Sequence, residues 1–241
     1  MILHLCRFTV KNQTYFIHSS IISGPIPECK YYLIRLIRLQ KNEIIPPMKD
    51  LIVPRDAFSH GQIKSKLWLS ERFSKWATQH LDTTAKYELN WYGSWVGIGP
   101  FLLMIGTGIQ FKAVNLFDLN AESLETSRLI LDYWRCEAIA MTTQLIDVNN
   151  HIPSAATHQI FINSACEHME SEAWLRNLPV GSIVLLQSTD MQHPEHVNCS
   201  RTLEDFVTKQ NRQMRVLESD QIHFDYPDKT FSRFMLLGMK T

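Results

Sequence analysis

The stretch VGIGPF, residues 96–101, decides the fold that this sequence predicts. It has the pattern of a buried strand end, a glycine turn and the first turn of a helix, with Pro100 at the helix start, where proline is favoured. About twenty residues later, the apolar segment 114–118 has the pattern of a second strand, which ends in Asp118. A glycine turn lets a ligand approach the backbone, and an acid at the next strand end can hold ribose hydroxyls. Together the two segments predict a nucleoside-binding βαβ unit.

The composition is that of a globular protein with a sizeable core, since 45% of the 241 residues are hydrophobic and 20% are charged. The 24 basic and 24 acidic side chains cancel, so we expect no nucleic acid as partner. No apolar run reaches the roughly 18 residues of a membrane span, and the first residues lack the basic flank of a secretion signal. The five scattered cysteines favour reduced thiols and a cytoplasmic location over a disulfide framework.

The composition shifts near residue 55, which divides the chain into an N-terminal extension, residues 1–55, and a domain over residues 56–241. Within the extension, residues 9–22 alternate loosely like a hairpin, and residues 31–40 are apolar and basic at a helix-like spacing. We expect this extension to form either a lid or a contact between two copies of the chain, as in a homodimer.

From residue 56 onward, helices and strands alternate. Asp56 or Ser59 can cap a helix that ends near His80, and a short helix is expected over 83–89. The pattern then predicts strands at 94–98, 113–117, 139–146, 159–164 and 182–187, and helices at 101–109, 121–133, 172–178 and 202–210. Two last strands, 214–224 and 231–239, leave no room for a crossover helix and should form a hairpin. The expected fold is α/β: a Rossmann-like, doubly wound sheet, mostly parallel, with a C-terminal antiparallel hairpin.

Ligands bind beside the carboxyl ends of the strands in such a sheet, and the motifs at these ends resemble those of a known family. Residues 96–101 are similar to the glycine loop of the class I S-adenosylmethionine-dependent methyltransferases, and Asp118 is similar to the acid of their ribose-binding strand. Asp147 follows the third strand, where related families often place an acid against the adenine amine. Residues 165–169 resemble the Glu-His segment of small-molecule quinone and related methyltransferases. The resemblance spans roughly residues 92–240.

The resemblance implies S-adenosylmethionine as the cofactor and a set of residues that bind it: Gly97, Ile98, Gly99, Asp118, Leu119, Asp147 and Asn163. Each of the main candidates also has a simpler interpretation. The glycines can permit a tight turn, Asp118 can cap a helix, and Asp147 can cap the turn before two asparagines. Two positions depart from the family: Trp95 stands where an acid often precedes the loop, and Asn163 replaces an acid that commonly ends the fourth strand.

The acceptor is expected beside the fourth and fifth strands. His168 and His196 are the candidates for catalysis, because a histidine there can take up a proton or orient the substrate. Four further residues are candidates for substrate contact: Glu167, Gln187, Asp190 and Lys64. The loop with His193, His196 and Cys199 offers ligands compatible with a metal, but its spacing fits no closed zinc pattern, and we assign no metal. Simpler interpretations are a helix cap for Glu167 and a solvated helix face for Lys64.

The function that follows is methyl transfer from S-adenosylmethionine to a small-molecule acceptor, in a cytoplasmic enzyme. One alternative keeps the cofactor and moves an aminoalkyl group, as in enzymes that resemble nicotianamine synthase or the polyamine synthases. A second alternative is a binding or assembly protein that retains the fold without the chemistry. A nicotinamide oxidoreductase is disfavoured, because Leu102 stands where the third fingerprint glycine belongs.

Overall fold

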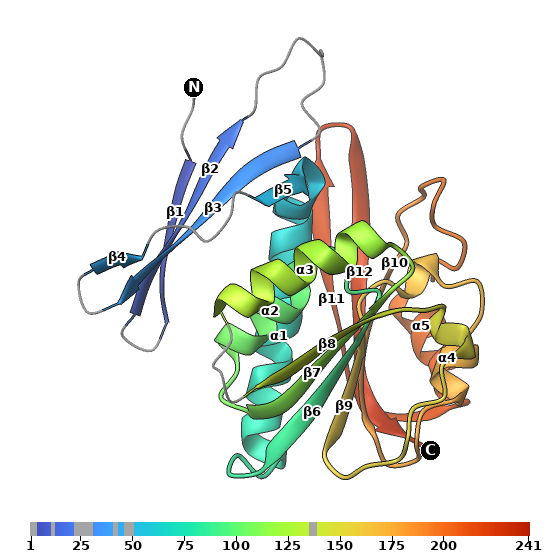
Figure 1. The fold of residues 1–241 in the computed structure, drawn as a ribbon. Coiled ribbons are helices and arrows are strands. Elements are labelled where there is room, and N and C mark those ends of the chain that lie inside the picture. The colour runs from blue at the N-terminus through green and yellow to red at the C-terminus, as the bar shows by residue number, and fades with distance from the viewer. Residues whose placement is uncertain (1–3, 11–12, 22–30, 41–42, 46–50, 135–138) are drawn as a thin grey trace.

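A seven-stranded sheet forms the centre of the computed structural model, which describes residues 4–10, 13–21, 31–40, 43–45, 51–134 and 139–241. Its strands are β6 (Lys86–Tyr92), β7 (Gln110–Asp118), β8 (Ala140–Leu145), β9 (Gln159–Asn163), β10 (Ile183–Thr189), β11 (Met214–Tyr226) and β12 (Lys229–Lys240). Their order across the sheet is β11-β12-β10-β9-β6-β7-β8 (Figure 1). Strands β6 to β10 run parallel, while β12 is antiparallel to both β10 and β11. The doubly wound sheet with a C-terminal antiparallel hairpin is therefore confirmed.

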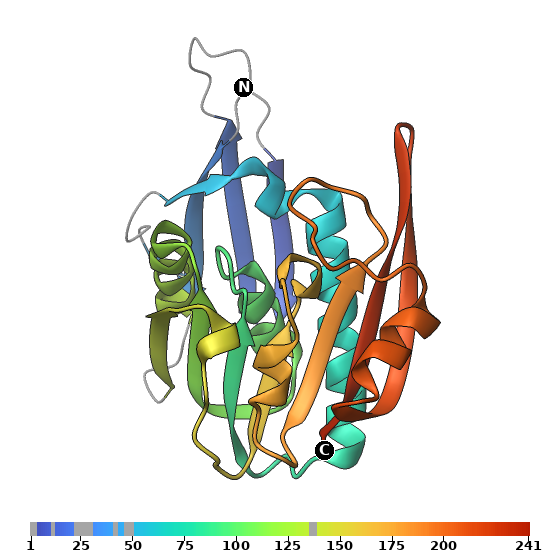
Figure 2. The ribbon, with the colours of Figure 1, turned by 90° about the vertical axis from the view of Figure 1, so that its right-hand side faces the viewer.

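Helices cover both faces of the sheet. On one face lie α1 (His60–His80), α2 (Ile98–Gly106) and α3 (Ala121–Trp134), and on the other lie α4 (Ala173–Arg176) and α5 (Leu203–Gln210), the face turned toward the viewer in Figure 2. Each face has its own apolar core, one built around Trp91 and Phe73 and the other around Trp174 and Phe206. Burial on both faces explains why β9 and β10 are buried along their whole length.

The first strand of the sheet differs from the prediction. The helix expected over 83–89 and the strand expected over 94–98 are both wrong, because β6 occupies Lys86–Tyr92. Glu88 and Asn90 gave this segment a polar pattern that is not typical of a buried strand. In the sheet, both accept a hydrogen bond from Nδ2 of Asn115 on β7, each at 3.0 Å. A cross-strand partner thus pairs one side-chain oxygen of each residue inside the sheet.

The helix after this strand is also displaced from its predicted range. It begins at Ile98 and ends at Gly106, rather than covering 101–109, so Pro100 is its third residue. Other predicted caps are confirmed: the Ser59 side chain accepts a hydrogen bond from Gln62 N–H at the start of α1, and Asn120 accepts one from Ser123 N–H at the start of α3. Among the described residues, no helix combines the length and apolarity that crossing a bilayer requires.

The N-terminal part of the chain forms a separate antiparallel sheet. Its strands are β1 (His4–Val10), β2 (Gln13–Ile21), β3 (Tyr31–Gln40), β4 (Glu43–Ile45) and β5 (Leu51–Pro54), followed by the short helix η1 (Arg55–Phe58). β1 and β2 form the expected hairpin. The helix-like spacing over residues 31–40 was misleading, because β3 pairs with β2 along most of its length and with β4 and β5 on its other side. The division of the chain at residue 55, the lid and the homodimer contact stay predictions.

Candidate functional site

A cavity of about 560 Å³ lies at the carboxyl ends of the parallel strands. Segments that follow β6, β7, β8, β9 and β10 contribute to its wall, together with residues of α1, α2 and β12. This is the edge of the sheet at which the sequence predicted a ligand, and the volume is typical of a small-molecule site.

The glycine turn at the cavity begins four residues earlier than the sequence predicted. β6 ends at Tyr92, and the turn that follows has positive φ angles at alternate residues: +63° at Gly93, +47° at Trp95 and +80° at Gly97. Gly93, Trp95 and Gly99 all line the cavity. Gly93 was not among the predicted site residues, although the sequence places it four residues before Gly97.

Gly97 and Gly99 have packing roles besides any role toward a ligand. Gly97 is the N-cap of α2, and a Cβ atom added there would lie 2.6 Å from Cβ of Ser127 on α3. At Gly99, an added Cβ would lie 2.5 Å from Cζ2 of Trp91. Ile98 and Gly99 also form part of the cavity wall, so the helix N-terminus faces the cavity.

The Asp118 carboxylate lies at the end of β7, beside this turn. Its Oδ2 accepts a hydrogen bond from the Trp95 backbone N–H at 2.7 Å, and its Oδ1 accepts one from the Asn120 N–H at 3.0 Å. Each carboxylate oxygen has two lone pairs, so one on each oxygen is left for a ligand. Asp118 and the exposed Leu119 both line the cavity. The cap of α3 is Asn120 and not Asp118, and the hydrogen bonds of Asp118 to the backbone leave its ligand interpretation open.

Asp147 caps a turn, as predicted, and also lines the cavity. Its Oδ1 accepts a hydrogen bond from Asn149 N–H at 2.9 Å and caps the short helix η2 (Val148–Asn150). It also lines the cavity, beside Ile146 and Val148. This part of the wall follows β8, so Asp118 and Asp147 lie at neighbouring strand ends.

At the other end of the cavity, Glu167 and Arg233 form an ion pair that is almost completely buried. Glu167 belongs to the short helix η3 (Cys166–His168), and Arg233 belongs to β12. Burial by itself would raise the pKa of the Glu167 carboxyl, but the charge of Arg233 and other groups outweighs burial and holds this pKa below its usual value. The carboxylate is therefore ionised. Arg233 was not among the predicted site residues, because its signal in the sequence is a basic residue inside an apolar strand.

A lysine from α1 reaches the same end of the cavity, but it is Lys66 and not the predicted Lys64. The Lys66 ammonium donates to the Ser164 carbonyl at 3.2 Å and to Oε1 of Gln187 at 3.0 Å. Burial, reinforced by the charge of Arg233, lowers the pKa of Lys66 to about 7. Lys64 instead lies over the ring of Phe224, 5.1 Å from its centroid.

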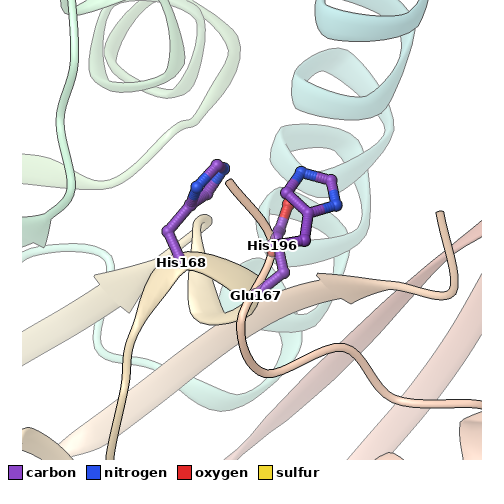
Figure 3. Close-up of side chains that lie close together, drawn as sticks. All are labelled: Glu167, His168 and His196. Carbon is purple, nitrogen blue, oxygen red and sulfur yellow. The ribbon is translucent and has the colours of Figure 1, made fainter. Parts of the chain in front are cut away.

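His168 and His196 lie next to one another in the cavity wall. Their rings are in edge-to-face contact with a centroid distance of 4.8 Å, and Figure 3 shows them with Glu167. The β10–α5 loop, residues 190–202, brings His196 here because the Glu167 carbonyl accepts hydrogen bonds from Val197 N–H at 2.9 Å and Asn198 N–H at 3.0 Å. Burial lowers the pKa of His168, which favours its neutral form.

Five residues predicted for the site lie outside the cavity wall that the described residues form: Gly97, Asn163, Gln187, Asp190 and Lys64. Asn163 is fully buried, and its Oδ1 accepts a hydrogen bond from Ala165 N–H at 3.0 Å. Gln187 accepts a hydrogen bond from the Lys66 ammonium, so it contacts the cavity wall through that lysine. Asp190 accepts a hydrogen bond from the Ser232 N–H on β12. Asn163 and Gln187 therefore contact residues of the cavity wall without lining it, whereas Lys64 contacts Phe224 instead.

Comparison with known proteins gives matches in structure only, since neither the models of protein families nor the curated protein sequences match this chain. An N-methyltransferase from Bradyrhizobium japonicum, solved in complex with S-adenosyl-L-homocysteine, matches 77% of this chain and 91% of its own with a TM-score of 0.55 and 12% identity. A putative methyltransferase from Bacillus halodurans matches 73% of this chain and 98% of its own, with a TM-score of 0.54 and 11% identity. Magnesium protoporphyrin IX methyltransferase from Synechocystis, with S-adenosylhomocysteine bound, matches 76% of this chain and 88% of its own, with a TM-score of 0.54 and 10% identity.

Proposed function

We propose that this chain, which has the fold of the class I S-adenosylmethionine-dependent methyltransferases, transfers a methyl group from S-adenosylmethionine to a small-molecule acceptor. Two of the structural neighbours with this fold are solved with the demethylated cofactor. At this level of sequence identity the likeness concerns the fold alone, so the proposal depends on the residues that this chain places in its own cavity.

The observation that carries the proposal is the position of Asp118. Its carboxylate faces the cavity at the end of β7 and keeps one lone pair on each oxygen beyond its two backbone hydrogen bonds. Two adjacent hydroxyls, such as those of a ribose, would fit this pair of acceptors. Gly93 lines the cavity and has no side chain, so a ligand can approach the backbone there. Asp147 at the neighbouring strand end is in place to accept a hydrogen bond from the adenine amine.

The opposite end of the cavity suits the acceptor. The bound cofactor would supply an electrophilic methyl group, and the protein must orient a nucleophile toward it and exclude water. Glu167, His168 and His196 present acceptor atoms to this end of the cavity, while Arg233 holds the Glu167 carboxylate in place. We place the orientation and deprotonation of the acceptor at these three side chains.

Calorimetry with S-adenosylhomocysteine tests the proposal. The wild-type chain should bind, and Asp118→Asn should weaken binding by about 1–3 kcal/mol, the range for hydrogen bonds to a charged group. Asp82→Asn is the matched control, because exposed Asp82 accepts a similar backbone hydrogen bond from Thr84, at 2.8 Å, at a distance from the cavity. Unchanged affinity in a folded Asp118→Asn variant contradicts the ribose assignment. Failure of the wild-type chain to bind would favour the non-catalytic alternative.

A further inference from the structure

Both histidines of the acceptor end have one ring nitrogen whose state is fixed by the backbone. His168 Nδ1 lies 3.1 Å from the carbonyl oxygen of Glu195, and His196 Nδ1 lies 2.7 Å from that of Met191. A carbonyl oxygen only accepts hydrogen bonds, so each Nδ1 must carry the proton. In the neutral rings, each Nε2 then keeps a free lone pair. A backbone carbonyl that orients an imidazole in this way is a common feature of metal-binding histidines.

The third group is a carboxylate with an unused oxygen. Arg233 pairs with Oε1 of Glu167, while Oε2 is buried and has no hydrogen-bond partner among the described residues. Glu167 is 1% exposed, and leaving a buried carboxylate oxygen without a partner costs free energy. A ligand that accepts a lone pair would remove this cost.

The three groups are close together and held there before any ligand arrives. One potential ligand atom from each of Glu167, His168 and His196 lies within 4.8 Å of the others (Figure 3). Ligand atoms around one ion are about 3–4 Å apart, so small rotations of the rings suffice. The β10–α5 loop is fixed in turn, since Glu167 O accepts two backbone hydrogen bonds from it and Thr189 O accepts one from Ser200 N–H at 3.2 Å.

We propose that Glu167, His168 and His196 together bind one divalent cation, with the remaining coordination positions open to the cavity. Two imidazoles and one carboxylate suit Zn²⁺ or Fe²⁺ better than Mg²⁺, which prefers oxygen ligands throughout. The site was hidden in the sequence, because His193 and Cys199 offered a more regular spacing with His196 than the Glu-His pair 28 residues earlier did.

The charges around the three ligands leave room for a cation. Arg233 is neutralised by its ion pair with Glu167, and the Lys66 ammonium donates to the Ser164 carbonyl and to Gln187. Arg233 reaches the carboxylate from β12, whereas the Nδ1 atoms of the two rings lie against carbonyl oxygens of the β10–α5 loop.

The role of the cation rests on the proposed function, whereas its binding does not. Bound at the acceptor end, it would coordinate an oxygen of the acceptor and lower the pKa of that hydroxyl, so that the nucleophile forms at neutral pH. The two histidines would then act through the ion, and the proton would leave to solvent.

Metal binding to the full chain tests the inference directly. The purified protein is treated with a chelator, dialysed, and titrated with Zn²⁺ or Mg²⁺, and bound metal is counted after gel filtration. We expect one Zn²⁺ per chain, with Mg²⁺ bound more weakly, and we expect His168→Ala and His196→Ala each to reduce Zn²⁺ affinity at least tenfold. Two control variants should bind as the wild type does: Cys199→Ser, which removes the thiol of the same loop, and His80→Ala on α1, far from the cavity.

The inference is overturned if the wild-type chain retains no Zn²⁺, or if the two histidine variants bind as tightly as the controls. The histidines carry the test because Glu167→Gln would leave Arg233 buried without a charged partner and could unfold the chain. Circular dichroism verifies the fold of each variant. Calorimetry with S-adenosylhomocysteine, set beside the Zn²⁺ titration, separates the two proposals. A chain that binds the cofactor but retains no Zn²⁺ in the titration refutes only the metal site, and a chain that retains Zn²⁺ but binds no cofactor refutes only the proposed function.

Discussion

At the scale of single residues, Gly97 shows how backbone conformation and packing can restrict one position. Its φ of +80° disfavours any side chain, and an added Cβ would lie 2.9 Å from Cα of Ser127. Gly97→Ala should therefore lower the free energy of unfolding by more than about 2 kcal/mol, measured by chemical denaturation.

Gly108→Ala is the matched control for this substitution. An added Cβ there has no described heavy atom within 4 Å, and its φ lies outside the left-handed region. The control should change stability by less than about 0.5 kcal/mol. Equal effects of the two substitutions would show that the turn tolerates a side chain at Gly97.

At the scale of elements, helix α1 is tied to the sheet by one half-buried lysine, Lys66. Lys66 meets the end of β9 through Ser164 and the middle of β10 through Gln187. The charged groups that face it are Arg233 on β12 and Glu167 on η3, with the Cys166 thiol beside them. A helix that binds the strand ends in this way closes one side of the cavity.

The depressed pKa of Lys66 predicts how stability depends on pH. Below about pH 7 the lysine is charged in both the folded and the unfolded chain, and the folded state bears the full cost of its burial. Between pH 7 and about 10 the folded state has lost the proton and the unfolded chain retains it, so stability rises with pH by up to about 1.4 kcal/mol per unit.

Substitution of this lysine removes that contribution. Lys66→Met should reduce the gain in unfolding free energy between pH 7 and pH 9 by roughly 2 kcal/mol relative to the wild type, measured by urea denaturation. Lys75→Met, on the exposed side of the same helix, should leave the gain unchanged. If the Lys66→Met variant shows the same gain in unfolding free energy as the wild type, then Lys66 keeps its proton above neutral pH.

At the scale of the whole molecule, a ligand in the cavity would join all the strand ends that form its wall. Segments after five parallel strands, together with α1, α2 and β12, meet there. Binding would therefore stabilise the folded chain against unfolding, by an amount that grows with the logarithm of the ligand concentration.

S-adenosylhomocysteine at about 100 times its dissociation constant should add about 2.7 kcal/mol to the unfolding free energy and raise the melting temperature by roughly 5–10 °C. At the same concentration, Asp118→Asn should show a smaller increase. NAD serves as the negative control, because a nicotinamide-binding fold would respond to it. An increase with NAD and none with S-adenosylhomocysteine would contradict the proposed cofactor. The shift can be measured by scanning calorimetry.

The sequence by itself determined the features that depend on local pattern. The apolar strands 159–164 and 182–187, the caps at Ser59 and Asn120, and the terminal hairpin are visible because burial, capping and short turns each leave a signal within a few residues. The strand ends that follow from this order predicted the edge of the sheet at which the cavity lies.

Only the tertiary structure decided which side chains meet there. The polar side chains of Glu88 and Asn90 on β6 accept hydrogen bonds from Asn115 on another strand. The position of β6 and the true start of the glycine turn at Gly93 were therefore hidden in the sequence. Arg233 and His196 reach Glu167 from segments distant in the sequence, and the choice of Lys66 over Lys64 depends on how α1 is rotated against the sheet. Contacts between distant segments depend on how the whole core packs, and a local pattern in the sequence does not reveal that packing.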